Sequence, residues 1–234
     1  MNRNHVPARS GIAYRLRRNT QSIQLAISSG ARAPGLATLR SVFGYCGKPF
    51  LRLEAGAWKI THGWLDMQRY VYPAPVGARL LGSCDVLDLT LLPRRYPDAH
   101  TVIFKAGFAG VLGHLMIWAA SQLVRLGLVR SLTPLVKPLH VVSKWIEPLG
   151  SDKGAMSVTL DGIGSDNKPL HLTWHLIAAQ NHGPHIPCGA SVALGRKLAR
   201  GEKPPAGAMP CIGLLSVDDY LRALEGYAVL ELPP

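Results

Sequence analysis

The feature that most constrains the fold is a pair of alternating stretches between residues 154 and 180. The segments "GAMSVTL" and "PLHLTWHLIA" alternate apolar and polar side chains, and the turn-rich segment "GIGSDN" connects them. Alternation with a period of two is typical of a β-strand with one buried face, and such a connection favours an antiparallel hairpin. The chain is therefore expected to contain an antiparallel sheet.

Shorter strand and helix patterns precede and follow this hairpin. Strands are expected within 22–28, 49–63 (two, around Ala55-Gly56), 68–83 (two, around a proline turn), 99–107 and 227–232. Helices are expected within 33–47, 108–130, 133–149, from Pro187 to near Gly201, and 216–226, with one short helical turn ended by Pro93. Strands and helices intermix, which predicts an α+β fold. We expect a mostly antiparallel or mixed sheet with helices packed on one face.

The helical pattern at 108–130 is unusually apolar. Between Lys105 and Arg125, 19 residues carry no formal charge, which is close to the length that crosses a bilayer. Against a crossing stand the polar His114 and Ser121. Two alternatives remain: a helix buried in protein or in an interface between chains, or a helix that makes peripheral contact with a membrane. Burial and dimer formation are the prediction.

The charge is concentrated at the amino-terminal end of the chain. The formal net charge is +12, but the first 53 residues hold nine of the Lys and Arg residues and no acidic residue. The remaining 181 residues have a net charge of only +3. Residues 1–21 are therefore expected to be a basic, disordered tail, and residues 22–234 to form one domain. Without a basic face that includes aromatic residues, the chain is not expected to bind nucleic acid.

The four cysteines predict no disulfide framework. Cys46, Cys84, Cys188 and Cys211 are widely spaced and form no CxxC pair. No apolar segment typical of a secretory signal follows the basic residues at the start of the chain. Reduced thiols and a cytoplasmic location are the expectation.

The segment "QNHGPHIPCGA" (180–190) brings soft side chains close together in the sequence. His182, His185 and Cys188 lie three residues apart and allow three interpretations: a metal site, a nucleophile with its base, or a structural loop. The spacing lacks the tight pairs that are typical of zinc sites. His171 and His175, on one face of the preceding strand, are expected to lie ~13 Å apart, too far to share one ion.

Several motifs in one order resemble a known family. The segments "GSDKGAMSV", "WHLIAAQNHGPHIP", "GRKLARG" and "GAMPCIGLLSVDDYLRAL" resemble the carboxyl-terminal half of saccharopine dehydrogenase-like oxidoreductases, over about residues 22–230. The resemblance implies a mixed sheet that follows a Rossmann domain, forms part of the substrate cleft and often contributes a dimer contact. It also implies NAD(P) as the cofactor of a complete member.

The resemblance selects a different set of residues in the 180–190 segment. His175, Gly183, Pro184, Ile186 and Pro187 match the family pattern, whereas His182, His185 and Cys188 fall on variable positions. We therefore expect His175, Gly183, Pro184 and Pro187 to line a substrate-binding cleft. Free N–H groups near Cys188 and Gly189 would form a weak anion site, and Lys197 would add positive charge.

A dinucleotide-binding fingerprint is missing from the sequence. No GxGxxG lies between a strand and a helix, and "GIGSDN" has the wrong glycine spacing within a hairpin turn. The chain is therefore expected to bind no cofactor by itself and to be inactive alone, which leaves open whether it is an enzyme. It would be a truncated half-enzyme, or a domain that works as a homodimer beside a separate Rossmann-domain chain. The alternative is a membrane- or lipid-associated interaction module.

Overall fold

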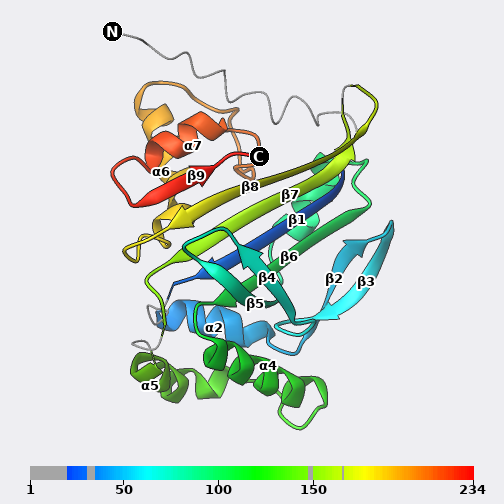
Figure 1. Ribbon diagram of the computed structural model, residues 1–234, viewed down its shortest axis with the longest axis vertical. Coiled ribbons are helices and arrows are strands. Elements are labelled where there is room, and N and C mark those ends of the chain that lie inside the picture. Colours follow the sequence, from blue (N-terminus) through cyan, green and yellow to red (C-terminus); the bar gives the residue numbers. More distant parts are fainter. Residues whose placement is uncertain (1–19, 31–34, 147–149, 165) are drawn as a thin grey trace.

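The computed structural model describes residues 20–30, 35–146, 150–164 and 166–234. Its strands form one mixed sheet with the order β3-β2-β6-β1-β7-β8-β9, which β4 and β5 join through pairing of β5 with β6 (Figure 1). The strands are β1 (Thr20–Ser29), β2 (Pro49–Glu54), β3 (Ala57–His62), β4 (Gln68–Tyr72), β5 (Gly77–Ser83), β6 (Thr101–Phe108), β7 (Gly154–Ile163), β8 (Pro169–Ala178) and β9 (Val229–Leu232).

The helices follow the strands in an irregular alternation along the chain. They are α2 (Leu36–Tyr45), α3 (Asp88–Arg95), α4 (Val111–Arg125), the short 3-10 helix η1 (Thr133–Leu135), α5 (Val136–Ile146), α6 (His185–Ala199) and α7 (Val217–Ala223). Among the strand pairs of the described residues, only β1 and β6 run parallel. The α+β fold with a mostly antiparallel sheet is confirmed.

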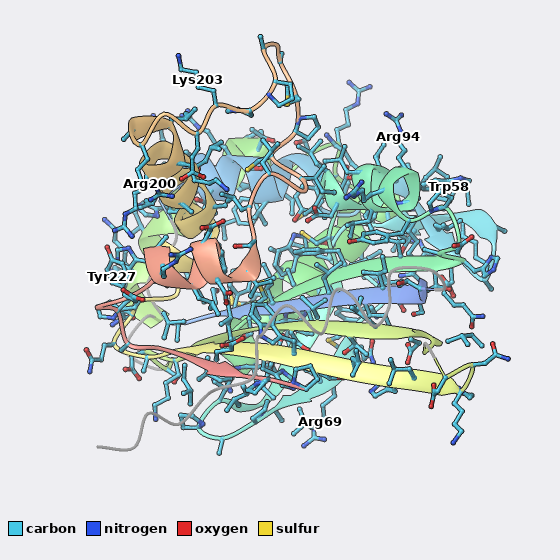
Figure 2. The ribbon with its side chains drawn as sticks, turned by 90° about the horizontal axis from the view of Figure 1, so that it is seen from above. Trp58, Arg69, Arg94, Arg200, Lys203 and Tyr227 are labelled. Carbon is cyan, nitrogen blue, oxygen red and sulfur yellow. The ribbon has the colours of Figure 1, made fainter. Side chains whose placement is uncertain are left out.

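The sheet has a helix-covered face and a hairpin-covered face. Leu176 and Ala178 of β8 pack against Ile186 of α6 and Leu224, at the end of α7. On the opposite face, Ile177 packs with Tyr72 and other residues of the β4–β5 hairpin. Figure 2 shows this layering, because Arg94 of α3 and Arg69 of β4 lie on opposite sides of the sheet.

The two predicted hairpins with short connections are confirmed. Ala55 and Gly56 link β2 to β3 with φ angles of 52° and 79°, and two consecutive positive φ angles are typical of the tight turns that match strand twist. β7 and β8 pair without interruption from Gly154–Ala178 to Ile163–Pro169. Period-two alternation in the sequence therefore identified the strands at the centre of the sheet.

Three expectations about helix boundaries are wrong. The predicted helix 108–130 is shorter, because Phe108 belongs to β6 and α4 covers only Val111–Arg125. α3 continues past Pro93 to Arg95, since a proline near the end of so short a helix disrupts few backbone bonds. α6 begins at His185 rather than after Pro187.

The single chain does not bury α4 on all sides. His114, Ile117 and Ser121 face inward, toward a core that includes Phe43 and Trp64, while the leucines of α4 face outward. The predicted burial of this helix is therefore wrong for one copy of the chain. No helix within the described ranges combines the length and apolar character that a membrane crossing needs.

The predicted tail lies almost wholly outside the described residues. Residues 1–19 are not part of the structure that is described here, whereas Thr20 and Gln21, which were assigned to the tail, belong to β1. The ordered domain therefore includes two residues more than the predicted 22–234.

Candidate functional site

The loop that carries Gly183, Pro184 and Pro187 forms the start of α6. The amide N–H groups of His185 and Ile186 bond to the carbonyl oxygens of His182 and Gly183, at 3.0 and 3.1 Å. The two prolines have no N–H, so the first turn of α6 offers no free donor. Cys188 and Gly189 lie further along, where helical N–H groups bond to the preceding turn. The anion site expected at this position is therefore not formed.

A shallow pocket of about 230 Å³ lies between α6 and the segment after α7. The ring of His185 stacks on Tyr227 with ring centroids 3.9 Å apart, and His182 meets both rings edge-on. The Ala228 N–H donates to Nδ1 of His182 at 2.8 Å, so that nitrogen is an acceptor. The pocket is lined by His185, Cys188, Gly189, Val192, Arg196, Ala223, Glu225, Gly226 and Tyr227.

Two of the three side chains that fall on variable positions of the family pattern thus line an open surface. His185 and Cys188 line the pocket, while Pro184 and Pro187 are exposed and are not among its lining residues. Within the described ranges, no three His, Cys, Asp or Glu side chains are grouped so that they could hold a metal ion.

Lys197 points toward α7 and not toward the loop. Its Nζ lies 3.4 Å from Asp219 and 3.4 Å from Glu202. Hydrogen bonds from Ser216 hold the pKa of Asp219 down to about 2, and Lys197 adds to this effect. Lys197 therefore takes part in an ion-pair group between α6 and α7.

His175 lies on the sheet face opposite α6. It pairs across the strands with Ser157, whose Oγ lies 2.7 Å from the hydroxyl of Tyr70 in the β4–β5 hairpin. Cross-strand partners project to the same side of a sheet. The expectation that His175 underlies the 183–187 loop is thus wrong in its geometry, because alternation along β8 turns residue 175 away from Leu176 and Ala178, which face α6.

Five residues on the facing sides of the β4–β5 hairpin and the sheet are linked in a group that we call the hairpin–sheet cluster. It comprises Tyr70, Tyr72, Arg79, Ser157 and His175. Tyr70 and Arg79 are cross-strand partners in the hairpin, so both face the sheet. Within the described part of the chain, the Tyr72 hydroxyl, Arg79 Nε and His175 Nδ1 are buried without a hydrogen-bond partner. Such orphaned atoms are costly, and they mark a place where water or a ligand would be bound.

Burial controls the protonation of this cluster. It lowers the pKa of His175, which keeps the imidazole neutral at pH 7, and it raises the pKa of Tyr72 far above its usual value, with Tyr70 adding to the effect. Burial also lowers the pKa of Arg79, although guanidinium stays charged. The cluster therefore combines one cation, a neutral imidazole and three hydroxyls, a set suited to binding a carboxylate.

An ion network with half or more of its side chains out of solvent contact lies along the same row of the sheet: Lys105 and Arg52 are largely buried, and Asp66 is partly exposed. Lys105 of β6 pairs with Ala26, which pairs with Ser157, so all three face the hairpin side. The Lys105 Nζ lies 2.9 Å from the carbonyl oxygen and 3.1 Å from the carboxylate of Asp66. Arg52 contacts the same carboxylate at 2.7 Å. These cations lower the pKa of Asp66 against the opposing effect of its burial.

Sequence reasoning found one of the five residues of the hairpin–sheet cluster. His175 was selected by resemblance, whereas Tyr70, Tyr72, Arg79 and Ser157 were not selected. The alternation of "RYVYP" places both tyrosines on one face of a strand, so their grouping could be predicted from the sequence. The position of that strand over β7 and β8 was not visible in the sequence.

Comparison with known proteins gives one line of evidence. No family model matches the chain, and no curated protein matches it. Among solved structures, the fold is similar to apo histidine-tagged saccharopine dehydrogenase (L-Glu forming) from Saccharomyces cerevisiae. The TM-score is 0.54 with 10% sequence identity, and the match covers 96% of this chain and 70% of that chain. The chain therefore has a fold distantly similar to that of saccharopine dehydrogenase.

Proposed function

We propose that the chain is the substrate-side and dimerisation domain of a saccharopine dehydrogenase-like NAD(P)-dependent oxidoreductase. It acts with a nicotinamide-binding domain that the present sequence does not contain, and it is inactive alone. The observation that carries the proposal is the fold similarity over 96% of the chain. The ordered motifs that resemble the same family add independent support.

The hairpin–sheet cluster is the proposed substrate contact. Arg79 supplies a guanidinium that pairs well with a carboxylate, and the orphaned Nδ1 of His175 and hydroxyl of Tyr72 supply further polar atoms. The fixed contact of Tyr70 with Ser157 holds the hairpin over the sheet. A neutral His175 can accept a proton from an amino group or return one. These groups complement the carboxylate and the amino group of an amino-acid substrate in charge and in hydrogen bonding.

The residues of the 183–187 loop lie on the other face of the sheet from the hairpin–sheet cluster. Gly183, Pro184 and Pro187 are sequence neighbours of His185 and Cys188, which line the pocket, and their contact with substrate or with a second domain stays a prediction. Lys197 is already engaged by two carboxylates and is a weaker candidate.

Calorimetric titration of the chain tests both halves of the proposal. NADPH and NADH should give no saturable heat, because the glycine fingerprint is missing. L-Glutamate, named for the similar yeast enzyme, should bind weakly, and His175→Ala or Arg79→Gln should reduce that binding about tenfold. His171→Ala is the matched control, because His171 lies on the same strand but is exposed and paired with Asp161.

Two results would contradict the proposed function. Micromolar binding of NADPH would show that the chain holds a nicotinamide site of its own. L-Glutamate binding that survives His175→Ala and Arg79→Gln would remove the hairpin–sheet cluster as the substrate contact.

A further inference from the structure

The outer surface of α4 is apolar where a surface helix should be polar. Of its four polar residues, His114 and Ser121 are both 0% exposed, while Gln122 is half-buried and only Arg125, the last residue of the helix, is exposed. Its other outward large side chains are Val111, leucines and a methionine, and exposed leucines continue through the turn that follows the helix. This surface, which we call the α4 outer face, comprises Leu112, Leu115, Met116, Leu123, Leu126 and Leu128.

This pattern reverses the usual arrangement of a surface helix. Such a helix normally buries its apolar stripe and exposes its polar residues. Leu126 and Leu128, just beyond the helix, are 69% and 70% exposed. A contiguous apolar patch of this kind marks a surface that contacts an apolar partner.

The position of the face suits contact with an extended surface. Figure 1 shows α4 and α5 at one end of the long axis of the molecule. Trp145, near the end of α5, is 79% exposed. Tryptophan is favoured where an apolar phase meets water, since its ring is apolar and its N–H remains hydrated.

The charged residues of α4, α5, α2 and the turns that connect α4 to α5 have one sign. Between Asp98 and Glu147 the sequence has no acidic residue, and Arg125, Arg130, Lys137 and Lys144 lie on or next to α4 and α5. α2, which packs against α5, adds Arg40 and no acidic residue. Across the described ranges, none of these five cations forms an ion pair.

We propose that the α4 outer face docks on the surface of an anionic lipid bilayer, with α4 lying in the plane of the interface. The leucines enter the boundary between headgroups and acyl chains, and the cations contact anionic headgroups. A second copy of the chain is a poorer occupant. In a two-fold contact the same basic patch would face itself, with no carboxylate to balance it.

Vesicle co-sedimentation of the full chain tests the proposal. Vesicles of phosphatidylcholine with roughly one-third phosphatidylserine should bind the chain, pure phosphatidylcholine should bind it far less, and added salt should weaken binding. The triple variant Leu112→Gln, Met116→Gln, Leu123→Gln should bind at least about tenfold less. All three positions are exposed, so the fold should be retained, as circular dichroism would check.

A matched triple variant controls for the general loss of apolar surface. Val71→Gln, Leu87→Gln and Leu198→Gln change side chains elsewhere that are at least as exposed, and this variant should bind as the parent chain does. Five arginines in residues 1–19 are present in every variant, so they cannot account for a difference. Arg125→Gln with Lys144→Gln should weaken binding more than Arg94→Gln with Lys203→Gln.

Equal vesicle binding by the α4 triple variant and its control would overturn the proposal. So would binding that does not depend on phosphatidylserine. If light scattering shows that the α4 triple variant converts a dimer to a monomer, the face is an interface between copies and the lipid assignment is wrong.

Discussion

At the scale of single residues, His114 shows how burial determines a response to pH. Both ring nitrogens are buried without a hydrogen-bond partner within the described part of the chain, and the ring meets Trp64 edge-on at 5.8 Å. Burial lowers the pKa of His114 from 6.5 to about 4. The folded chain therefore holds this histidine neutral, whereas the unfolded chain protonates it readily.

The predicted consequence is a loss of stability in mild acid. Between pH 6.5 and 4 the unfolded chain binds more protons, so the free energy of unfolding falls as pH falls, by at most about 1.4 kcal/mol per pH unit from this residue. Urea unfolding at several pH values should show the slope, and His114→Leu should reduce it. Exposed His100→Leu is the control; an unchanged slope in His114→Leu would refute the assignment.

Asp66 supports a second prediction at this scale, based on charge. Asp66→Asn removes the one carboxylate that pairs with the Lys105 ammonium among the described residues, and Lys105 is 9% exposed. Breaking a buried pair costs about 3–5 kcal/mol, and since Asp66 is partly exposed we expect about 1–2 kcal/mol. Urea unfolding at pH 7 measures this, with Glu202→Gln in a surface pair as the control. Similar losses of unfolding free energy in both variants would show that the burial of Lys105 does not increase the cost of removing its partner.

The sequence predicted residue types at the site better than their grouping. His171 and His175 share one sheet face, as the strand spacing predicted. The sequence could not show which face the helices cover, because β8 is apolar at some positions of both faces, such as Leu176 and Ile177. His175 was consequently assigned to the wrong side, beside the 183–187 loop.

At the scale of elements, local chemistry was a good guide to hairpins and caps. The helix expected within 216–226 begins after Ser216, and the structure has both hydrogen bonds of a capping box between Ser216 and Asp219, a pattern that the sequence also contains. Helix lengths were less predictable. The apolar run at 106–124 contains the end of β6, Gly110 and α4, and a buried strand and a helix look alike in a sequence that is apolar throughout.

The capping box gives an element-scale prediction. Ser216→Ala removes the acceptor for the Asp219 N–H and should cost about 1 kcal/mol of unfolding free energy. α7 is also tied to α6 by the Tyr220 hydroxyl, which donates to the Ile186 carbonyl oxygen at 2.7 Å. Ser191→Ala, on an exposed position inside α6, should be neutral or slightly stabilising in the same urea experiment. An equal cost for both would contradict the role of the cap.

At the scale of the whole molecule, the fold class followed from the sequence but the layering did not. The strand patterns predicted a mostly antiparallel sheet, and the order of motifs predicted the similarity to saccharopine dehydrogenase that the fold shows. The β4–β5 hairpin folds over β7 and β8, and the contact between Tyr70 and Ser157 joins residues that are 87 positions apart in the chain. Contacts of such separation depend on packing that no local pattern encodes.

The sheet ends at β3, an edge strand that offers a route to the proposed dimer. Trp58 and Ile60 project from one side of β3 and are 51% and 70% exposed, and Leu51 of β2 lies beside Ile60. Unpaired edge strands with apolar side chains favour association. Unlike the α4 outer face, this surface has charges of both signs nearby, in Lys59 and Glu54.

We therefore expect a dimer that forms through β3. Light scattering at micromolar concentration should give twice the mass of the 25.3 kDa chain. Ile60→Lys should shift the population to monomer, because two copies would then place like charges in a contact that excludes water. Val71→Lys, on the exposed side of the β4–β5 hairpin, is the control and should stay dimeric. A parent chain that remains monomeric at these concentrations would remove dimerisation from the proposed function, and a dimer that survives Ile60→Lys would move the interface away from β3.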